Sequence, residues 1–387
     1  MNKIKVCHII TMLELGGAQR NTLYTLANLD RDRFVTVLIC GKGGTLDAEA
    51  RSSASFKTYF LNGLVRPVKP LKDLLCVFSI LKILRAERPD VVHTHSSKAG
   101  ILGRIAAWLA GIPVVVHTFH GFGFNDFQNP LTRAVYVFAE KITAPLADRF
   151  IAVTNEDITK GLRYGIGPAE KYSLIRSGID ISRYSSLAMD KNALKREFGL
   201  PQDTSVVTTI GPFKPQKNLG DFVRASAVIL KSFPRAYFLV AGDGEQKHML
   251  KELIGRLGLE GKVILLGWRG DTDKILSVTD VFVMTSLWEG LPRSILEAMS
   301  SGLPVVANAV DGVKEIVKDG TTGYLVEPRD IGRLAEKTAY LLNNPAAAKE
   351  MGKKARAAID AQYDIRNMVK EQERLYLELM EKYAGAK

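Results

Sequence analysis

The sequence predicts an α/β protein with two doubly wound domains in tandem, and three observations lead to this fold class. Apolar runs rich in Val and Ile alternate with helical patterns along the chain, which is typical of parallel strands covered by helices on both faces. The alternation occurs twice, before and after residues 178–192. The chain has 387 residues, a length more common for two domains than for one.

The first domain is expected over residues 1–184. Its first strand lies in the opening run MNKIKVCHIITM, which meets Glu14 and two glycines too soon to be a signal peptide. Apolar runs predict strands at 4–10, 34–40, 56–61, 90–94, 113–118 and 149–154. Helical patterns lie between them, near 17–29, 71–87, 97–110 and 130–146.

The second domain is expected over residues 185–365, followed by a last helix over 366–387. The segment GIDISRYSSLAMDKN (178–192) is interpreted as the linker. Because such sheets bind ligands at the carboxyl ends of their strands, the two domains are expected to face each other across a ligand cleft. Strands are predicted near 205–210, 236–241, 262–266, 280–285, 304–307 and 323–326, and helices near 218–231, 245–258, 292–300 and 330–343.

Composition indicates a globular, cytoplasmic protein. Hydrophobic residues make up 46% of the chain and charged residues 24%. No apolar run approaches the ~20 residues that a membrane span needs. Cys7, Cys40 and Cys76 each lie in or beside an apolar run, which indicates buried, reduced cysteines and neither a disulfide framework nor a metal site.

The positive charge is concentrated in the first half. The formal net charge is +12; residues 1–185 hold 24 basic and 15 acidic residues, and the remainder holds 29 and 26. A basic half can meet nucleic acid, an anionic membrane surface or an acidic substrate. No nucleic-acid-binding module is recognisable, so the composition favours a membrane or a lipid phosphate over nucleic acid.

Two windows of this half, 66–88 and 127–146, combine apolar stripes with basic residues. Such stripes are usually the packed face of a helix with a solvated back. If the substrate is carried on a lipid, they are where the protein would touch the bilayer. The basic residues are Arg66, Lys69, Lys72, Lys82, Arg85 and Arg88 in the first window, and Arg133 and Lys141 in the second.

The most informative stretch is SLWEGLPRSILEAMSSGLP, residues 286–304. It places Glu289 in a loop and Glu297 inside a helix that Gly302-Leu303-Pro304 ends. Free amides and the helix dipole at such a helix start favour a phosphate, and two carboxylates can hold two sets of hydroxyls, so the stretch suits a nucleotide sugar. The alternative is a capped surface helix with two solvated glutamates. The turn before the helix is Gly290-Leu291, and Pro292 is expected at the first helical position.

Two glycines and a histidine are the candidates of the first half. Gly16 and Gly17 follow the first strand and open a helix, where glycine lets the backbone approach a phosphate closely; a plain tight turn is the alternative. His120 is expected at the end of a strand, where it begins the loop HGFGF. This loop is expected to be flexible, with its aromatic rings exposed to solvent. The alternative is a loop histidine with satisfied hydrogen bonds.

His93 and His95 are two residues apart on a strand and therefore share a face. Such a pair could hold a metal, but no carboxylate or cysteine completes a ligand set at a recognisable spacing. Hydrogen-bonded histidines and a capped helix start at Ser96-Ser97 are therefore preferred, and no metal site is predicted.

Glu289 and Glu297 stand in the string EGLPRSILEAMSSGLPVVA, which strongly resembles the Glu-x7-Glu motif of glycosyltransferase family 4, retaining enzymes of the GT-B fold. The resemblance covers essentially the whole chain and is strongest over 205–326. It implies that Glu289 meets the donor sugar and Glu297 the ribose. It also implies that His120 reaches the sugar and the reacting centre, and that the Gly16-Gly17 loop approaches the donor phosphates.

Further donor-site residues follow from the same resemblance. The family pattern Gly-Arg-x4-Lys matches Gly211 and Lys217, but Pro212 replaces the arginine that usually helps neutralise the diphosphate. Lys214 or Arg293 are candidates to replace it. The string AGDGE brings Asp243 close to the nucleotide, and Trp268 and Arg269 flank the nucleobase; an ordinary loop is the alternative for that pair. The last helix is expected to cross back onto the first domain.

The resemblance implies a retaining, metal-independent glycosyltransferase that needs no cofactor beyond its donor, a UDP-sugar by preference. No Asp-x-Asp motif is present, so Lys217 and the amides of Gly290 and Leu291 are expected to stabilise the leaving diphosphate. The strings HTHSSKAGILGR and HTFHGFGF look most like bacterial enzymes of surface-polysaccharide assembly. A polyprenyl-linked saccharide acceptor at the inner face of the plasma membrane is therefore expected, and no nucleic acid.

Two other functions stay open from the residues alone. A nucleotide-sugar epimerase shares the fold, although no first-domain carboxylate stands out for proton transfer. A non-catalytic nucleotide-sugar-binding or lipid-binding subunit is compatible with Pro212.

Overall fold

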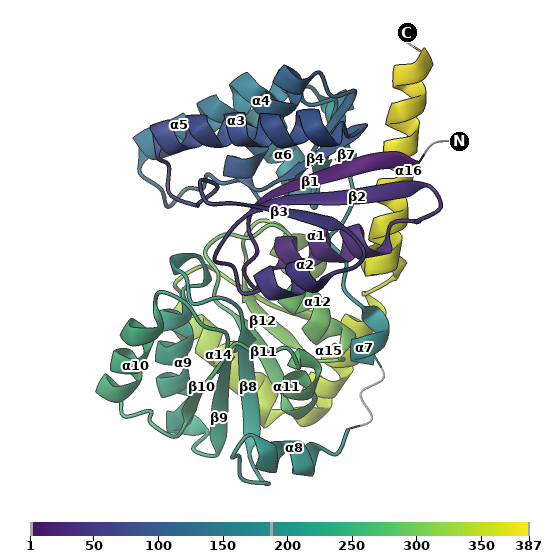
Figure 1. Ribbon diagram of the computed structural model, residues 1–387. Coiled ribbons are helices and arrows are strands. Elements are labelled where there is room, and N and C mark those ends of the chain that lie inside the picture. Colours follow the sequence, from purple (N-terminus) through teal and green to yellow (C-terminus); the bar gives the residue numbers. More distant parts are fainter. Residues whose placement is uncertain (1–2, 186–188, 386–387) are drawn as a thin grey trace. The chain divides into compact units, whose positions relative to one another are not determined.

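The computed structural model describes residues 3–185 and 189–385, which form two compact units. Unit 1 contains residues 1–178 and 365–387, and unit 2 contains residues 179–364. Each unit is built on its own parallel sheet (Figure 1). The predicted class of two Rossmann-like α/β domains is confirmed.

The sheet of unit 1 has seven strands in the order β3-β2-β1-β4-β5-β6-β7. All of its neighbouring strands pair in parallel, and the order reverses direction between β1 and β4. The strands are β1 (Ile4–Met12), β2 (Phe34–Gly41), β3 (Lys57–Leu61), β4 (Val91–His95), β5 (Val114–Phe119), β6 (Arg149–Ala152) and β7 (Tyr172–Leu174). The sequence did not predict β7, because three partly exposed residues at a sheet edge form no continuous apolar run.

Side chains alternate between the two faces of this sheet, so each face has its own core. Cys7 and Ile9 of β1 pack with α3 and α4, whereas Val6 of the same strand packs on the opposite face. The helices that cover the sheet are α1 (Gly17–Asn28), α2 (Asp47–Ser52), α3 (Pro70–Glu87), α4 (Ser97–Ala110), α5 (Pro130–Thr143) and α6 (Asn155–Arg163).

The last helix, α16 (Ile365–Gly385), belongs to unit 1. Its apolar side chains Met368, Leu375 and Tyr376 join the core that also holds Val6 and Phe34. Tyr376 is completely buried. The carboxyl-terminal segment therefore supplies part of the core on the face of the sheet that carries α1 (Figure 1).

The sheet of unit 2 has six parallel strands in the order β10-β9-β8-β11-β12-β13. Its order reverses between β8 and β11, as in unit 1 between β1 and β4. The strands are β8 (Ser205–Ile210), β9 (Ala236–Ala241), β10 (Val263–Gly267), β11 (Val281–Met284), β12 (Val305–Asn308) and β13 (Gly323–Val326). Every one of them coincides with a predicted strand to within one residue at each end.

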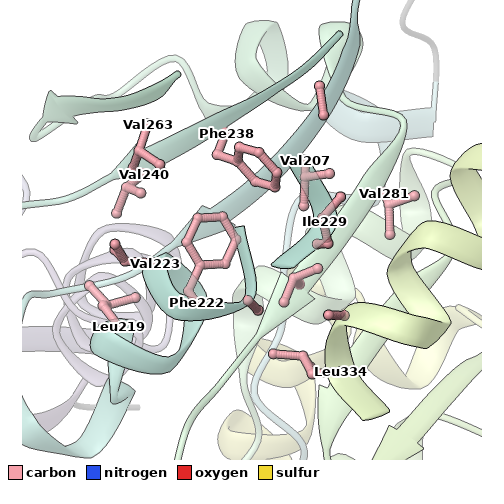
Figure 2. Close-up of a cluster of buried hydrophobic side chains, with 14 of the residues drawn as sticks. Val207, Leu219, Phe222, Val223, Ile229, Phe238, Val240, Val263, Val281 and Leu334 are labelled. Atoms are coloured by element: carbon pink, nitrogen blue, oxygen red, sulfur yellow. The ribbon is translucent and has the colours of Figure 1, made fainter. Parts of the chain in front are cut away.

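Figure 2 shows the main core of unit 2, in which Phe222 and Phe238 pack among branched aliphatic side chains. The helices of the unit are α7 (Ile181–Ser185), α8 (Lys191–Glu197), α9 (Leu219–Ser232), α10 (Lys247–Arg256), α11 (Thr272–Val278), α12 (Arg293–Ser300), α13 (Val313–Ile316), α14 (Ile331–Asn343) and α15 (Pro345–Ala357). The shortest of these helices were not predicted, since fewer than two turns give little periodicity.

The segment 178–192, expected as a linker, contains α7 and the start of α8, both within unit 2. Tyr184 is buried and its hydroxyl lies 2.9 Å from the Thr272 hydroxyl. Arg183 forms an ion pair with Asp273 at 2.5 Å. These contacts fix α7 against α11 and α12. Residues 186–188, in the middle of the segment, lie outside the described part of the chain.

The three cysteines are free and buried, as predicted. Burial raises the pKa of the Cys76 thiol to about 11, which keeps it protonated and unreactive at neutral pH. Among the described residues, no helix combines the length and the apolar character that crossing a bilayer requires.

Candidate functional site

The candidate site of unit 2 lies at the carboxyl ends of β8 and β11, the two neighbouring strands between which the sheet order reverses. Doubly wound sheets leave an open crevice at this position, because the connections on either side run in opposite directions. The loop after β8 carries Lys217, and the loop after β11 carries Glu289. Strand order thus brings together two residues that are 72 positions apart in the chain.

Lys217 and Glu289 form an ion pair, with Nζ 2.5 Å from Oε1. Their side chains are 13% and 8% exposed, so little water screens the pair. Two hydrogen bonds between side chains and the backbone also hold this region. The Gln216 side-chain amide donates to the Trp288 carbonyl at 2.8 Å, and the Glu289 backbone amide donates to Asp311 at 2.8 Å. The carboxylate and the ammonium are therefore held in place before any ligand binds.

Helix α12 begins at Arg293, one residue after Pro292, so the expectation that Pro292 is the first helical residue is wrong. Pro292 instead has an extended ψ of 105° and precedes the helix as its N-cap. The turn Gly290-Leu291 comes just before it, as expected. After Ser301, Gly302 adopts φ 76°, and the helix ends where the sequence predicts.

Glu297 lies one turn inside α12, within 3.6 Å of the Arg293 guanidinium. Glu289 and Glu297 are only 9% and 8% exposed. The alternative of two solvated glutamates on a surface helix is therefore wrong. Arg293, a candidate to replace the missing arginine at Pro212, is committed to Glu297 in this structure.

The loops after β8 and β9 approach each other at two glycines. Gly242 has φ 142°, and a Cβ there would lie 1.9 Å from the Gly211 carbonyl oxygen, so only glycine fits. Asp243 follows and forms an ion pair with Lys247 at 2.6 Å. The hydrogen bond from Lys247 holds the pKa of Asp243 below its usual value. Asp243 therefore stays ionised beside the Gly211 loop.

Trp268 and Arg269 follow β10, next to Gly242, whose amide donates to the Gly267 carbonyl at 2.8 Å. The Arg269 guanidinium binds both carboxylate oxygens of Asp271, at 2.9 and 2.7 Å. The charge of this arginine is thus paired with Asp271, while its side chain is 31% exposed. The Trp268 side chain is 37% exposed and remains available for contact.

The candidates of unit 1 lie at the corresponding edge of its sheet. Gly16 is the N-cap of α1 and Gly17 its first residue, directly after β1. His120 follows β5, partly exposed, with its Nε2 3.1 Å from Nδ1 of His95. Burial lowers the pKa of His120 to about 4, so its imidazole is neutral at physiological pH.

The loop HGFGF differs from its prediction in one respect. Phe122 and Phe124 are buried, 7% and 1% exposed, where exposed rings were expected. They pack with Phe119, Phe150 and Tyr164, because aromatic rings this large gain more from a shared core than from solvent. The loop that carries the His120 imidazole is therefore anchored by Phe122 and Phe124 in this aromatic core.

His93 and His95 share a face of β4, as predicted, and the structure adds His8 of β1 to them. One ligand atom from each of these three histidines lies within 4.8 Å of the others, so the cluster could hold a metal ion. Its nitrogens already form hydrogen bonds, to one another and to Tyr376 and Thr118. Sequence reasoning missed His8 and Tyr376; the signal for His8 was its period-2 position on a strand adjacent to β4.

The candidate residues of the two units suit different parts of a ligand. Unit 2 offers a buried carboxylate, an ammonium and a helix start, which suit an anionic ligand that also carries hydroxyls. Unit 1 offers a neutral imidazole and a glycine loop. The cleft expected between the two units stays a prediction.

Two family models match the chain. The model described as Glycosyltransferase Family 4 matches residues 15–183, and the model described as Glycosyl transferases group 1 matches residues 190–358. Together they cover the six-stranded sheet of unit 2 and all strands of the unit 1 sheet except β1.

Relatives are similar to this chain over most of their length. The UDP-Gal:alpha-D-GlcNAc-diphosphoundecaprenol alpha-1,3-galactosyltransferase of Escherichia coli is 38% identical over 334 residues, which are 85% of this chain and 86% of that protein. The capsular polysaccharide biosynthesis glycosyltransferase CapM of Staphylococcus aureus is 23% identical, over 83% and 85% of the two chains.

Solved structures share the fold. The HepE protein of Anabaena in complex with UDP-glucose superposes with a TM-score of 0.80 at 25% identity, covering 97% of this chain and 99% of that one. Sucrose-phosphate synthase from Thermosynechococcus elongatus gives a TM-score of 0.83 at 22% identity, covering 98% and 100%.

Proposed function

Because this chain belongs to glycosyltransferase family 4 and has the GT-B fold, we propose that it transfers a sugar from a UDP-sugar to a polyprenyl-linked saccharide, with retention of configuration and without a metal ion. The product would be an intermediate of cell-surface polysaccharide. The observation that carries the proposal is the buried Lys217–Glu289 pair at the switch point of unit 2.

Lys217 and Glu289 suit two neighbouring parts of a nucleotide sugar, the diphosphate and the sugar. As the sugar–phosphate bond breaks, negative charge develops on the leaving diphosphate, and a preorganised cation stabilises it without reorganisation. Lys217 and the amides of Gly290 and Leu291 take this role, and Glu289 accepts hydrogen bonds from the sugar hydroxyls. Glu297, one turn into α12, binds the ribose.

Retention is supported by the relative from Escherichia coli, whose name gives an alpha-1,3 linkage. The acceptor hydroxyl attacks from the face that the diphosphate leaves, and a diphosphate oxygen takes its proton. No enzyme carboxylate is required as a nucleophile. The cation that a metal would supply is supplied by Lys217, so the proposed reaction needs no metal and no other cofactor.

A lipid-borne acceptor is supported by the surface of unit 1. The exposed side chains of α5 fall at intervals of four, three and four residues, which places them on one face. Exposed apolar side chains of this kind and number mark an interaction surface. We call this the α3–α5 apolar surface: Leu71, Leu74, Leu75 and Phe78 of α3, and Leu131, Val135, Phe138 and Ile142 of α5.

Basic residues lie on the same two helices as the α3–α5 apolar surface, or directly before them. Lys69, Lys72, Lys82, Arg85 and Lys141 are all exposed. Apolar side chains with a cationic margin fit a bilayer that contains anionic lipid. This surface supports the proposal that the enzyme acts in the cytoplasm, at the inner face of the plasma membrane, with a membrane and not a nucleic acid as its partner.

The test has two stages. Thermal-shift measurements with UDP, GDP, ADP and their sugars identify the donor, and UDP-sugars are expected to raise the melting temperature most. Transfer is then followed by mass spectrometry, with polyprenyl-diphosphate-linked N-acetylglucosamine as acceptor, with and without EDTA. A glycosylated product that forms equally in EDTA is expected; loss of transfer in EDTA would contradict the metal-independent mechanism.

A UDP-sugar incubated without acceptor separates the alternatives. Conversion to a second UDP-sugar would indicate an epimerase. Binding with neither transfer nor hydrolysis of any donor would indicate a non-catalytic subunit.

A further inference from the structure

A buried row of hydrogen bonds crosses unit 1 from α16 to the loop after β5. The Tyr376 hydroxyl lies 2.5 Å from His93 Nδ1 and 3.4 Å from His8 Nε2. His8 Nδ1 lies 2.9 Å from His95 Nε2, and His95 Nδ1 lies 3.1 Å from His120 Nε2. The row therefore ends at the histidine that the sequence placed in the site.

Each imidazole of the row is neutral, so it carries one N–H and one lone pair. His8, His93 and Tyr376 are completely buried and His95 is 3% exposed. Burial lowers the pKa of each histidine and raises that of the tyrosine, so no member of the row is charged at neutral pH. Each contact between two imidazoles must then contain one proton only.

The Tyr376 hydroxyl sets the direction in which the hydrogen bonds of the row donate. Its single proton belongs in the 2.5 Å contact with His93 Nδ1, because the 3.4 Å contacts with His8 Nε2 and Gln372 Oε1 are longer and therefore weaker hydrogen bonds. The phenol oxygen then offers only lone pairs to His8 Nε2. His8 Nε2 must therefore carry the N–H. A lone pair on this nitrogen would face a lone pair of the phenol oxygen, and both buried acceptors would lack a donor.

The remaining protons follow in order. His8 accepts through Nδ1 from His95 Nε2–H, and His95 accepts through Nδ1 from His120 Nε2–H. We propose that this row, fixed at its far end by the Tyr376 hydroxyl, holds His120 in the Nε2–H tautomer, so that His120 presents the Nδ1 lone pair to a hydroxyl group of the bound substrate. Tyr376, His8 and His95 are positioning residues in this scheme.

The branch through His93 is consistent with the same direction. With Nδ1 accepting from Tyr376, His93 donates from Nε2 to the Thr118 hydroxyl at 2.6 Å. Thr118 lines a cavity of about 10 Å³, room for one water molecule, together with Asn21, His95, His120 and Gln372. Asn21 is 2% exposed, and its carboxamide has no hydrogen-bond partner among the described residues. The lining also includes the apolar side chains of Ile151, Val153, Ile175 and Met368, so the cavity gives the Thr118 hydroxyl both polar and apolar neighbours.

The role of the lone pair rests on the proposed function, whereas the tautomer does not. A hydroxyl group of the donor sugar or of the acceptor saccharide can donate a hydrogen bond to the Nδ1 lone pair of His120. In the opposite tautomer Nδ1 carries a hydrogen, which would face the hydroxyl hydrogen and could not accept from it. A matched control exists in unit 1: the Tyr172 hydroxyl donates to the Ile166 carbonyl outside the row.

The tautomers are measured by long-range ¹H–¹⁵N correlation spectra of the full chain labelled with ¹⁵N-histidine at pH 7.5, with His120 assigned through His120→Gln. The expected wild-type result is a protonated Nε2 on His8, His93, His95 and His120. Tyr376→Phe keeps the ring packing and is expected to redistribute these tautomers. It should also lower kcat about 10- to 100-fold, the range for outer-shell positioning groups, with donor KM within about twofold. Tyr172→Phe should change neither.

A wild-type His120 protonated on Nδ1 would overturn the proposal. This measurement uses the wild-type protein, so it does not depend on whether a variant folds. Unchanged tautomers in Tyr376→Phe would overturn it too, as would one equivalent of metal found by elemental analysis, since a metal would take the lone pairs of the row. If the tautomers are as expected but no sugar is transferred, the row stands and the proposed function fails.

Discussion

At the scale of single residues, the pairing of Lys217 with Glu289 has two separable consequences. The pair is a structural contact between the loops after β8 and β11, and it is also the proposed charge at the leaving group. A buried pair contributes little net stability, but removing one partner leaves an uncompensated charge, which typically costs about 3–5 kcal/mol. Structure and catalysis can therefore be separated with two variants.

Lys217→Met is expected to lower both the free energy of unfolding and the rate of transfer. The double variant Lys217→Met/Glu289→Gln leaves no unpaired buried charge, so it should regain most of the stability. Its activity should stay at least ~10²-fold below wild type, because the cation at the leaving group is still missing. Urea unfolding and initial rates measure the two effects. Recovery of transfer in the double variant would refute the proposed role.

Glu297 is expected to contribute to nucleotide affinity. Glu297→Ala removes a carboxylate that accepts ribose hydrogen bonds, and should weaken UDP binding by about 1.5–3 kcal/mol, the range for a hydrogen bond to a charged group. Isothermal calorimetry provides the measurement. Glu336→Ala is the control, since that glutamate forms an exposed ion pair with Arg333 on α14. Equal affinities in both variants would exclude the ribose assignment.

At the scale of elements, α5 is unusual because only Glu140 and Thr143 of its fourteen residues are buried. Glu140 reaches inward to Arg104 of α4, with Nη2 and Oε2 2.5 Å apart and both side chains almost completely buried. The helix is thus held by this polar contact and by the partly buried Tyr136 and Val137, while the α5 residues of the α3–α5 apolar surface face outward. This explains why 127–146 reads as an amphipathic helix although its apolar stripe is not packed in a core.

Vesicle binding tests this helix. Val135→Ser/Phe138→Ser should reduce partitioning to phosphatidylglycerol vesicles about tenfold or more, since each apolar side chain that enters the bilayer contributes about 1.5–3 kcal/mol when fully buried. Binding should also weaken with salt. Val228→Ser, an exposed valine of α9 in unit 2, is the control. Co-sedimentation equal to wild type would remove the α3–α5 apolar surface as the membrane contact.

At the scale of the whole molecule, the two units differ in the number of their histidines. His8, His93, His95, His117 and His120 lie in unit 1, whereas residues 179–364 contain His248 only. Burial is the leading cause that lowers the pKa of each of the five. Unfolding exposes them to water, where their pKa returns to about 6.5.

Mild acid should therefore destabilise unit 1 selectively. Because the folded pKa values lie below the unfolded one, the full stability is present above pH 6.5 and is lost as the pH falls toward the folded values. Each histidine lowers the free energy of unfolding by up to about 1.4 kcal/mol per pH unit in that range. Hydrogen exchange at pH 7.5 and 5.5, corrected for intrinsic rates, should show lost protection in β1 and β4 and little change in β8 and β11. Equal loss in both units would contradict this.

The fold was largely readable from the sequence, as were several of the candidate residues. Buried parallel strands are continuous apolar runs, so twelve of the thirteen strands in the described residues were predicted, and the three-residue β7 was missed. Lys217 and Glu289 were each selected from local strings, and the structure brings them together. The exposed rings of the HGFGF loop were predicted wrongly, because a loop string does not show which core lies beneath it.

The sequence by itself determined the two parallel sheets, the buried free cysteines and the loop–helix unit that carries Glu289 and Glu297, because each depends on periodicity or on residues close together in the chain. Only the tertiary structure decided which side chains meet. Strand order brings Lys217 to Glu289, and the return of α16 brings Tyr376 to His93, 283 residues away. The physical reason is that local sequence patterns set which face of an element is buried, whereas the partner on that face is set by the order in which distant elements pack.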